Sequence, residues 1–146
     1  MQEGKKIAAG VLPICKSTGR ILLVRRSIEK GNTWAMFGGK FDPEFDHSGK
    51  DIAKREFEEE SGYCKPYEIS KNAFYVNDNP HIVYYSFIGL FDEEFTPCGK
   101  DHDREHTDFG WFDIDKLPEN LHTELKELFI TKRDSLEKII NKHKIG

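Results

Sequence analysis

The stretch GGKFDPEFDHSGKDIAKREFEEESGY, from Gly38 to Tyr63, decides the fold because it joins a glycine pair to a helix with well-marked ends. Ser48 is a typical helix N-cap, and Asp51 three residues later completes a variant of the capping box. Gly62 ends the run, because glycine readily adopts the left-handed conformation that closes helices. We therefore predict a helix over GKDIAKREFEEES, residues 49–61.

Three glutamates share one face of this predicted helix. Glu56, Glu59 and Glu60 follow the i, i+3, i+4 spacing that brings side chains close together. Like charges at this spacing cost roughly a few tenths of a kcal/mol per pair on a bare helix. A charge run is ordinarily a solvated surface, whereas a bound divalent cation would give this crowding a purpose.

The positions of these glutamates on a helical wheel favour a bound cation over a solvated surface. The apolar face consists of Ile52, Ala53 and Phe57. Glu56 and Glu60 lie at the edge of that face. The residues farther toward solvent are Lys50, Lys54 and Glu58, and Glu58 is expected to behave as a surface acid. Carboxylates at the core boundary, near Gly38 and Gly39, suit magnesium, which takes oxygen ligands and keeps water molecules for substrate phosphates. One such water would be the nucleophile, because the metal lowers its pKa.

Apolar runs rich in β-branched and aromatic residues surround the helix and are predicted as strands. They are Lys6–Ile14, Ile21–Arg26, Trp34–Phe37, Tyr67–Val76, Ile82–Leu90 and Phe109–Ile114. The turn-forming STG makes the first two a hairpin, and Gly38 and Gly39 are expected to break the sheet. Between Pro118 and Lys142, apolar residues recur at three- and four-residue steps, which predicts one or two amphipathic helices. The expected architecture is a mixed sheet with helices packed on it, an α/β chain of the α+β kind.

Composition excludes several classes of protein. The length of 146 residues fits a single domain, residues 1–146, with one hydrophobic core. A formal charge of −4 leaves no basic excess for a stable complex with nucleic acid. The three cysteines lack C-x-x-C spacing, which argues against a disulfide framework or zinc site and favours a reducing cytoplasm. We expect no membrane span and no export signal.

The segment from Gly38 to Tyr63 resembles the Nudix box, G-x5-E-x7-R-E-U-x-E-E-x-G-U, in which U is a bulky apolar residue. Every fixed position in the second half of the box is matched, namely Arg55, Glu56, Phe57, Glu59, Glu60, Gly62 and Tyr63. Seven specified positions within nine residues seldom coincide by chance. The resemblance implies the Nudix fold, a mixed β-sheet sandwiched between α-helices.

The first half of the box departs from the family pattern. Fifteen residues separate its second glycine from its arginine where the pattern has thirteen, so the loop carries a two-residue insertion. The lone glutamate position falls on Phe45 or His47, depending on the end from which it is counted. Glu44 or Asp46 would replace that glutamate as a support for the loop.

The resemblance assigns roles to the matched residues. Glu56, Glu59 and Glu60 would bind Mg²⁺, with Mn²⁺ as a substitute, and one of the three would also serve as a base. The carbonyl of Gly38 would be a further ligand. Arg55 would hold a box carboxylate in place through paired hydrogen bonds.

A further acid is expected ahead of WFDIDKLP, residues 111–118, because family members often place one on the preceding loop. Glu105 is the first choice, either as a metal ligand or as the general base. His106 and Asp108 are the substitutes. The alternative is that this charged loop is simply solvated.

Substrate-binding candidates flank the box. Arg26, or its neighbour Arg25, would suit a phosphate because the planar guanidinium matches oxyanion geometry. Gly39 and Lys40 have a similar claim, and a strand-end charge facing water is the alternative reading. Aromatic residues that would suit stacking on a base, although aromatics in strands are more often core, are Trp34, Phe41, Tyr84 and Tyr85.

The implied function is metal-dependent hydrolysis of the pyrophosphate bond in a nucleoside diphosphate linked to another group X. Nucleoside triphosphates, ADP-ribose and dinucleoside polyphosphates all present this bond, and the sequence does not choose among them. The alternative is a non-catalytic nucleotide-binding sensor, which would be marked by a lost box glutamate, and all three are present. The expected partner is a small nucleotide, and the resemblance allows a homodimer.

Overall fold

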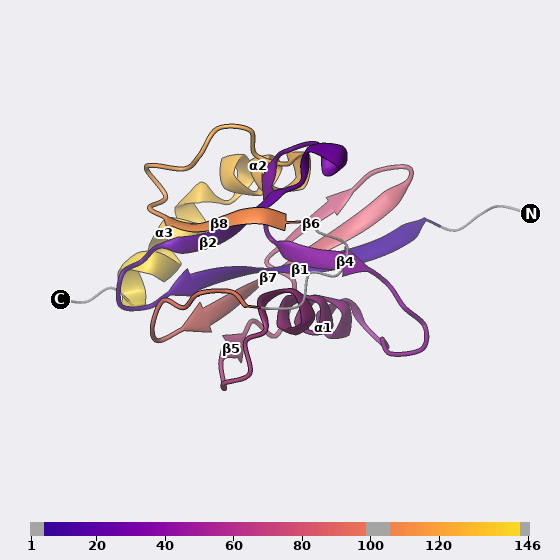
Figure 1. The fold of residues 1–146 in the computed structure, drawn as a ribbon, viewed down its shortest axis with the longest axis horizontal. Helices are drawn as coiled ribbons and strands as arrows, with labels where there is room; N and C mark the ends of the chain where they lie inside the picture. Colours follow the sequence, from indigo (N-terminus) through magenta and orange to yellow (C-terminus); the bar gives the residue numbers. More distant parts are fainter. Residues whose placement is uncertain (1–4, 99–105, 144–146) are drawn as a thin grey trace, which may run out of the picture.

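The sheet is organised around one long strand, β1 (Lys6–Cys15), in a computed structural model that describes residues 5–98 and 106–143 (Figure 1). All ten residues of β1 pair in parallel with β7 (Ile82–Phe91). Two strands share the other edge of β1. Strand β4 (Phe37–Lys40) pairs antiparallel with its first half, and β2 (Ile21–Arg26) pairs antiparallel with its end. The strands β2 and β4 therefore lie along different parts of the same edge.

The remaining strands extend the sheet on both sides. Strands β3 (Trp34–Ala35) and β8 (His106–Phe112) pair with β2, while β5 (Glu68–Ile69) and β6 (Tyr75–Asp78) pair with β7. The described strands form one mixed sheet of eight. Among the strands of the described residues, β1 and β7 are the one pair that runs parallel, which confirms the mixed sheet expected from the sequence.

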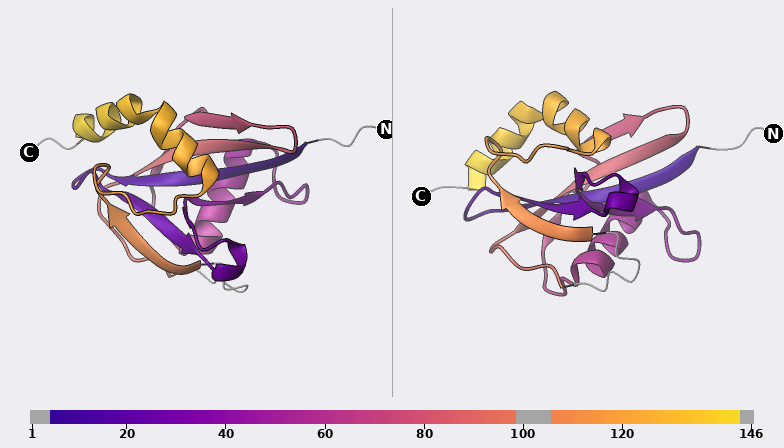
Figure 2. Two further views of the ribbon diagram at one scale, coloured as in Figure 1. Left: turned by 90° about the horizontal axis from the view of Figure 1, so that it is seen from above. Right: turned by 45° about the horizontal axis from the view of Figure 1, so that its top comes forward.

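Helices cover both faces of this sheet. Helix α1 (Gly49–Ser61) lies on one face, and α2 (Thr123–Thr131) and α3 (Arg133–His143) lie on the other (Figures 1 and 2). A single 3₁₀ turn, η1 (Ile28–Lys30), joins β2 to β3. None of the helices within the described ranges is long and apolar enough to cross a membrane.

The period-two alternation of β1 separates two hydrophobic cores. Leu12 and Ile14 pack with α2 and α3, while Ala9 and Val11 pack with α1. Successive side chains of a strand point to opposite faces, so one apolar run supplies both layers. The predicted sandwich of a sheet between helices is confirmed.

Two predicted strands are shorter or divided in the structure. The expected strand Tyr67–Val76 is wrong as a single element, because it is divided into β5 and β6, and between them only the backbone amides of Ser70 and Phe74 still donate to β7. The Ser70 hydroxyl accepts the Ile88 amide hydrogen at 3.1 Å and so replaces a backbone partner. The expected strand Trp34–Phe37 is likewise divided at Met36 into β3 and the start of β4.

The glycine pair does not break the sheet, contrary to the sequence-based expectation. Gly38 and Gly39 lie inside β4, opposite Gly10 and Ala9 of β1. A Cβ on Gly38 would collide with the Tyr84 hydroxyl, and one on Gly39 would collide with the Glu56 carboxylate. The glycines are therefore needed for close approach of other groups to the strand and not for a turn.

Candidate functional site

Helix α1 brings the three box glutamates to the edge of β4. Ser48 caps it by accepting the Asp51 amide hydrogen at 3.2 Å, and Gly62 closes it in the left-handed conformation. Both predicted ends are confirmed. The predicted apolar face is also confirmed, because Ile52, Ala53 and Phe57 are fully buried. This face fixes the rotation of the helix about its axis and thus the direction of its glutamates.

Two of the three glutamates lie against the glycine pair. Glu60 Oε1 accepts the Gly38 amide hydrogen at 3.0 Å, and Glu60 Oε2 lies 3.6 Å from His106 Nε2. The Glu56 carboxylate fills the space in which a side chain of residue 39 would stand. Two carboxylates are thereby gathered where α1 meets β4.

The third glutamate is placed differently. The Glu59 side chain is 59% exposed, compared with 14% for Glu60, and its carboxylate lies 3.5 Å from the Arg55 guanidinium. Glu58 is not the plain surface acid expected from the wheel. Its side chain is 40% exposed and accepts a hydrogen bond of 2.9 Å from the Tyr67 hydroxyl. The helical wheel overestimated the exposure of Glu58 because the chain after α1 folds back and covers this side chain.

Arg55 clamps the loop that precedes the helix. Its Nε and Nη2 atoms donate to the two oxygens of Asp46 at 3.0 and 2.7 Å, and Nη2 also reaches the Lys40 carbonyl at 3.2 Å. The Asp46 side chain is only 1% exposed, and its carboxylate accepts the Asp42 amide hydrogen. The hydrogen bond from Arg55 lowers the pKa of Asp46 despite the opposing effect of burial.

This clamp decides between the two candidate loop supports. Asp46 takes that position, whereas Glu44 is exposed on the same loop. A paired guanidinium and carboxylate hold a loop in one geometry better than a single hydrogen bond does. Arg55 holds the Asp46 carboxylate through this pair of hydrogen bonds.

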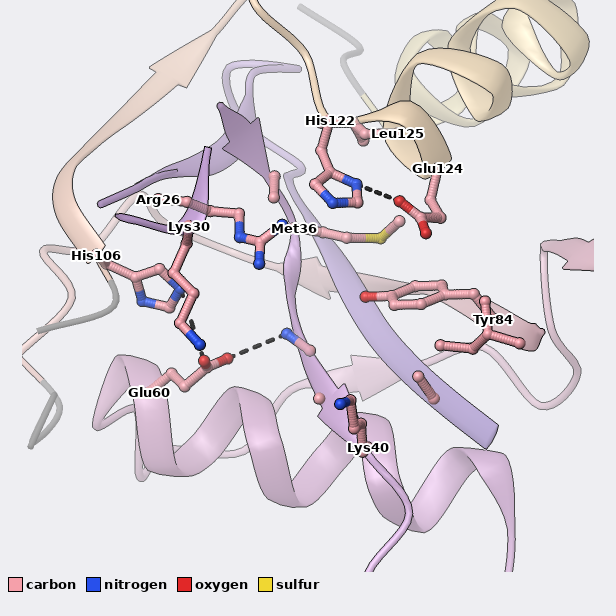
Figure 3. A pocket seen from close by; sticks show the side chains of 15 residues that line it. Arg26, Lys30, Met36, Lys40, Glu60, Tyr84, His106, His122, Glu124 and Leu125 are labelled. Atoms are coloured by element: carbon pink, nitrogen blue, oxygen red, sulfur yellow. Dashed lines mark hydrogen bonds and ion pairs between the residues drawn. The ribbon is translucent and has the colours of Figure 1, made fainter. Parts of the chain in front are cut away.

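A cavity of about 220 Å³ opens beside Glu60 (Figure 3). Residues that the sequence proposed as binding groups and that line it are Arg26, Gly38, Gly39, Lys40 and Glu60. Arg25, the alternative to Arg26, does not line the cavity and donates to the Asn32 side chain at 2.8 Å. Successive residues of β2 point to opposite faces, which separates the two arginines.

The family model of the NUDIX domain matches residues 4–132. This chain belongs to the Nudix family. No curated protein matches it in sequence.

Solved structures of other Nudix proteins share the fold. The MutT/nudix family protein from Enterococcus faecalis is 18% identical, with a TM-score of 0.71 over 94% of this chain and 64% of that chain. The MutT NUDIX hydrolase from Burkholderia pseudomallei is 24% identical, with a TM-score of 0.63 over 94% of this chain and 99% of that one.

A third structure is the bifunctional NMN adenylyltransferase/ADP ribose pyrophosphatase from Francisella tularensis, complexed with AMP and a Mn ion. It is 16% identical, with a TM-score of 0.65 over 92% of this chain and 43% of that chain. The Nudix chain described here thus spans less than two thirds of the first and third of these proteins. At these identities the likeness shows the fold alone.

The donor groups of this Nudix box suit a hard divalent cation. They are carboxylate and carbonyl oxygens, which are the ligands that Mg²⁺ and Mn²⁺ prefer. The close fit of the Glu56 carboxylate against Gly39 and of Glu60 against Gly38 holds two donors beside the β4 backbone. Within residues 5–98 and 106–143, no three His, Cys, Asp or Glu side chains already stand in a metal-binding arrangement, and the Glu59 carboxylate lies 3.5 Å from Arg55.

The expected loop acid, Glu105, lies outside the described residues. Of its two substitutes, Asp108 is exposed on β8, whereas His106 lies beside Glu60 and lines the cavity. The ring of His106 also packs edge-on against Phe37, with 6.2 Å between centroids. His106 is therefore the described member of this group that is integrated into the site.

The cavity of the Nudix chain includes residues that sequence reasoning missed. They are Lys30 from η1, Met36 from the β3–β4 junction, and His122 and Glu124 at the start of α2. Tyr84 from β7, which the sequence offers as a stacking or core aromatic, also lines the cavity. No local pattern marks these positions, because each faces the cavity only through the packing of its element.

Proposed function

We propose that this Nudix protein hydrolyses the pyrophosphate bond of a nucleoside diphosphate joined to a second group X, with Mg²⁺ as cofactor and Mn²⁺ as a substitute. The observation that carries the proposal is the position of Glu60. This glutamate belongs to the box helix, accepts the Gly38 amide hydrogen and lines the cavity that also receives Arg26. An acid group for a cation and a basic group for a phosphate thus face one space.

Glu56, Glu59 and Glu60 would hold the cation, and the Gly38 carbonyl would add a neutral oxygen. When bound, a divalent cation lowers the pKa of a coordinated water and neutralises charge on the phosphate oxygens. One of the three carboxylates, or Glu105, would accept the proton of the attacking water. The clamp between Arg55 and Asp46 keeps the loop and the helix in register for this task.

The basic side chains of the cavity suit the phosphates of the substrate. Arg26, Lys30 and Lys40 come from β2, η1 and β4 and line the same cavity as Glu60. A guanidinium can bind two phosphate oxygens at once, and the lysines supply point charges. Together they offset the repulsion between the box glutamates and an anionic substrate.

Candidate substrates are nucleoside triphosphates, ADP-ribose and dinucleoside polyphosphates. The similar structure from Francisella tularensis is named as an ADP ribose pyrophosphatase and contains AMP and Mn, which makes ADP-ribose and Mn²⁺ natural first tests. We further propose a single domain over residues 1–146, a cytoplasmic location and a homodimer as the assembly to test.

A release assay tests the proposal directly. Nucleoside triphosphates, ADP-ribose, dinucleoside polyphosphates and nucleotide sugars are each incubated with Mg²⁺, with Mn²⁺ and with chelator. Metal-dependent release of a nucleotide from one class is the expected result and identifies that class as the substrate. No turnover in any arm, combined with tight nucleotide binding, would replace hydrolysis by the sensor function.

The two neighbouring arginines of β2 offer a matched pair of variants. Replacing Arg26 by alanine should raise KM for the substrate found in that assay about 10- to 100-fold, the equivalent of one lost charge-assisted hydrogen bond. Arg25→Ala should leave KM nearly unchanged, because Arg25 donates to Asn32 and does not line the cavity. Steady-state kinetics of both variants checks this, and equal effects would contradict the assignment of Arg26.

A further inference from the structure

The end of the cavity away from the box glutamates carries a second polar pair. His122 and Glu124 stand at the start of α2, and His122 Nδ1 is in direct contact with Glu124 Oε2. Figure 3 shows this pair and Glu60 on different sides of the cavity, with Met36 between them. Neither residue belongs to the Nudix box or has a role in the proposed hydrolysis.

Glu124 presents an ionised carboxylate to the cavity. Its side chain is only 19% exposed. Burial alone would raise its pKa, but the hydrogen bond from His122, its own backbone N–H and the charge of Arg26 lower that pKa overall. An ionised carboxylate accepts hydrogen bonds and donates none, so a ligand that binds at this end of the cavity must offer hydrogen-bond donors.

The space between the two ends is largely apolar. Met36, Ile82 and Leu125 line it, and the ring of Tyr84 forms one side. The Tyr84 hydroxyl approaches the backbone at Gly10 and Gly38, where no Cβ would fit. Burial, together with the charges of Glu60 and Glu124, raises the pKa of Tyr84, which keeps this hydroxyl protonated. The flat, weakly polar walls suit a nucleoside more than a second phosphate group.

The cations that line the cavity are Arg26, Lys30 and Lys40, and the charge of Arg26 also reaches Glu124. Glu124 supplies an acceptor beyond the apolar walls. A ligand that matches both ends is anionic at one end and carries hydrogen-bond donors at the other. A nucleotide has this character when the donors lie on its base or its ribose.

We propose that Glu124, positioned by His122, selects substrates whose non-phosphate end offers two adjacent hydrogen-bond donors. Two parts of a nucleotide meet this condition, namely the N1–H and 2-amino group of guanine and the cis-diol of ribose. Adenine and cytosine place an acceptor next to their amino group, so one carboxylate oxygen would face a lone pair. This inference rests on the proposed function, because that function places the phosphates at the opposite end.

Binding of nucleoside monophosphates to the whole protein in chelator tests the selection without turnover. Calorimetry with GMP, IMP, AMP and 2′-deoxy-GMP separates the two donor sources. If guanine supplies the donors, IMP and AMP should bind about tenfold or more weakly than GMP, with 2′-deoxy-GMP equal to GMP. If ribose supplies them, the three ribonucleotides should bind alike and 2′-deoxy-GMP about tenfold more weakly. Equal binding of all four, or no binding at millimolar concentration, would overturn the proposal.

A variant pair tests the residue itself. Glu124→Gln keeps the size of the side chain but replaces one acceptor by a donor, and it should remove most of the discrimination among the four ligands. Glu119→Gln is the control, since Glu119 is exposed and does not line the cavity. Unchanged discrimination in Glu124→Gln would reject the inference. A thermal melt of both variants separates a loss of folding from a loss of selection.

The failure of this inference can be told apart from the failure of the proposed function. Metal-dependent turnover without any preference among the monophosphates would leave the hydrolase standing and remove the role of Glu124. A clear preference in chelator without turnover of any substrate would leave Glu124 as a selecting residue in a nucleotide-binding sensor.

Discussion

Replacing Glu60 by glutamine is expected to lower kcat/KM roughly 1,000-fold, because a metal ligand supplies several kcal/mol of transition-state stabilisation. The amide oxygen of glutamine can still accept the Gly38 amide hydrogen that Glu60 accepts at 3.0 Å, so the local hydrogen bond survives. Folding should therefore be nearly unaffected. Steady-state kinetics over a range of Mg²⁺ concentrations, together with a thermal melt, measures both effects. Glu56→Gln and Glu59→Gln should also lose most of their turnover.

Glu58→Gln is the matched control on the same helix. Glu58 faces the Tyr67 hydroxyl and the Lys54 ammonium group, away from the glycine pair. A glutamine there can still accept the hydrogen bond from Tyr67, so turnover should stay within about threefold of the unaltered protein. A loss at Glu58 as large as that at Glu60 would show that the face of α1 assigned to the metal is wrong.

Replacing Asp46 by alanine is expected to destabilise the protein by about 2–3 kcal/mol, because the partly buried Arg55 guanidinium loses its two hydrogen bonds to Asp46. Turnover should fall as well, about 10- to 100-fold, since the loop between Lys40 and the box helix loses its anchor. Urea denaturation at neutral pH measures the free energy of unfolding. Glu44→Ala on the same loop should change that energy by less than about 0.5 kcal/mol, because Glu44 is exposed.

The contribution of Asp46 to stability should depend on pH in a defined direction. Arg55 lowers the pKa of Asp46 below the ordinary value of 3.8, so the folded state favours the ionised carboxylate. A group with a lowered pKa stabilises the fold above its unfolded pKa, and that stabilisation is lost as the pH falls through the folded pKa. The difference in unfolding free energy between the unaltered protein and Asp46→Ala should thus be constant above about pH 5 and narrow in stronger acid. A difference that widens in acid would contradict the clamp.

Local sequence patterns were sufficient to predict the ends and the apolar face of the helix that carries the box. Ser48 and Gly62 mark its ends through interactions within a few residues, and both act in the structure as expected. The apolar face was also predictable, because the helical period alone determines which residues share a side. Glu58 was misjudged, because its exposure depends on Tyr67, which returns to the helix from the next segment.

The glycine pair shows why some predictions failed. Glycine in a sequence most often indicates a turn, but Gly38 and Gly39 are needed because other groups approach β4 closely. One of those groups, the Tyr84 hydroxyl, comes from a strand more than forty residues away. A pattern read along the chain contains no information about such an approach.

The sequence by itself determined the box helix, the face of its glutamates and the resemblance to the Nudix family. These features depend on residues close together in the chain, where helix geometry sets which side chains are neighbours. Tertiary structure alone decided that Asp46 supports the loop, that Arg26 and not Arg25 lines the cavity, and that Glu124 lies at its other end. These features depend on the relative positions of β2, β7 and α2. Only the packing of the two hydrophobic cores against one sheet determines those positions.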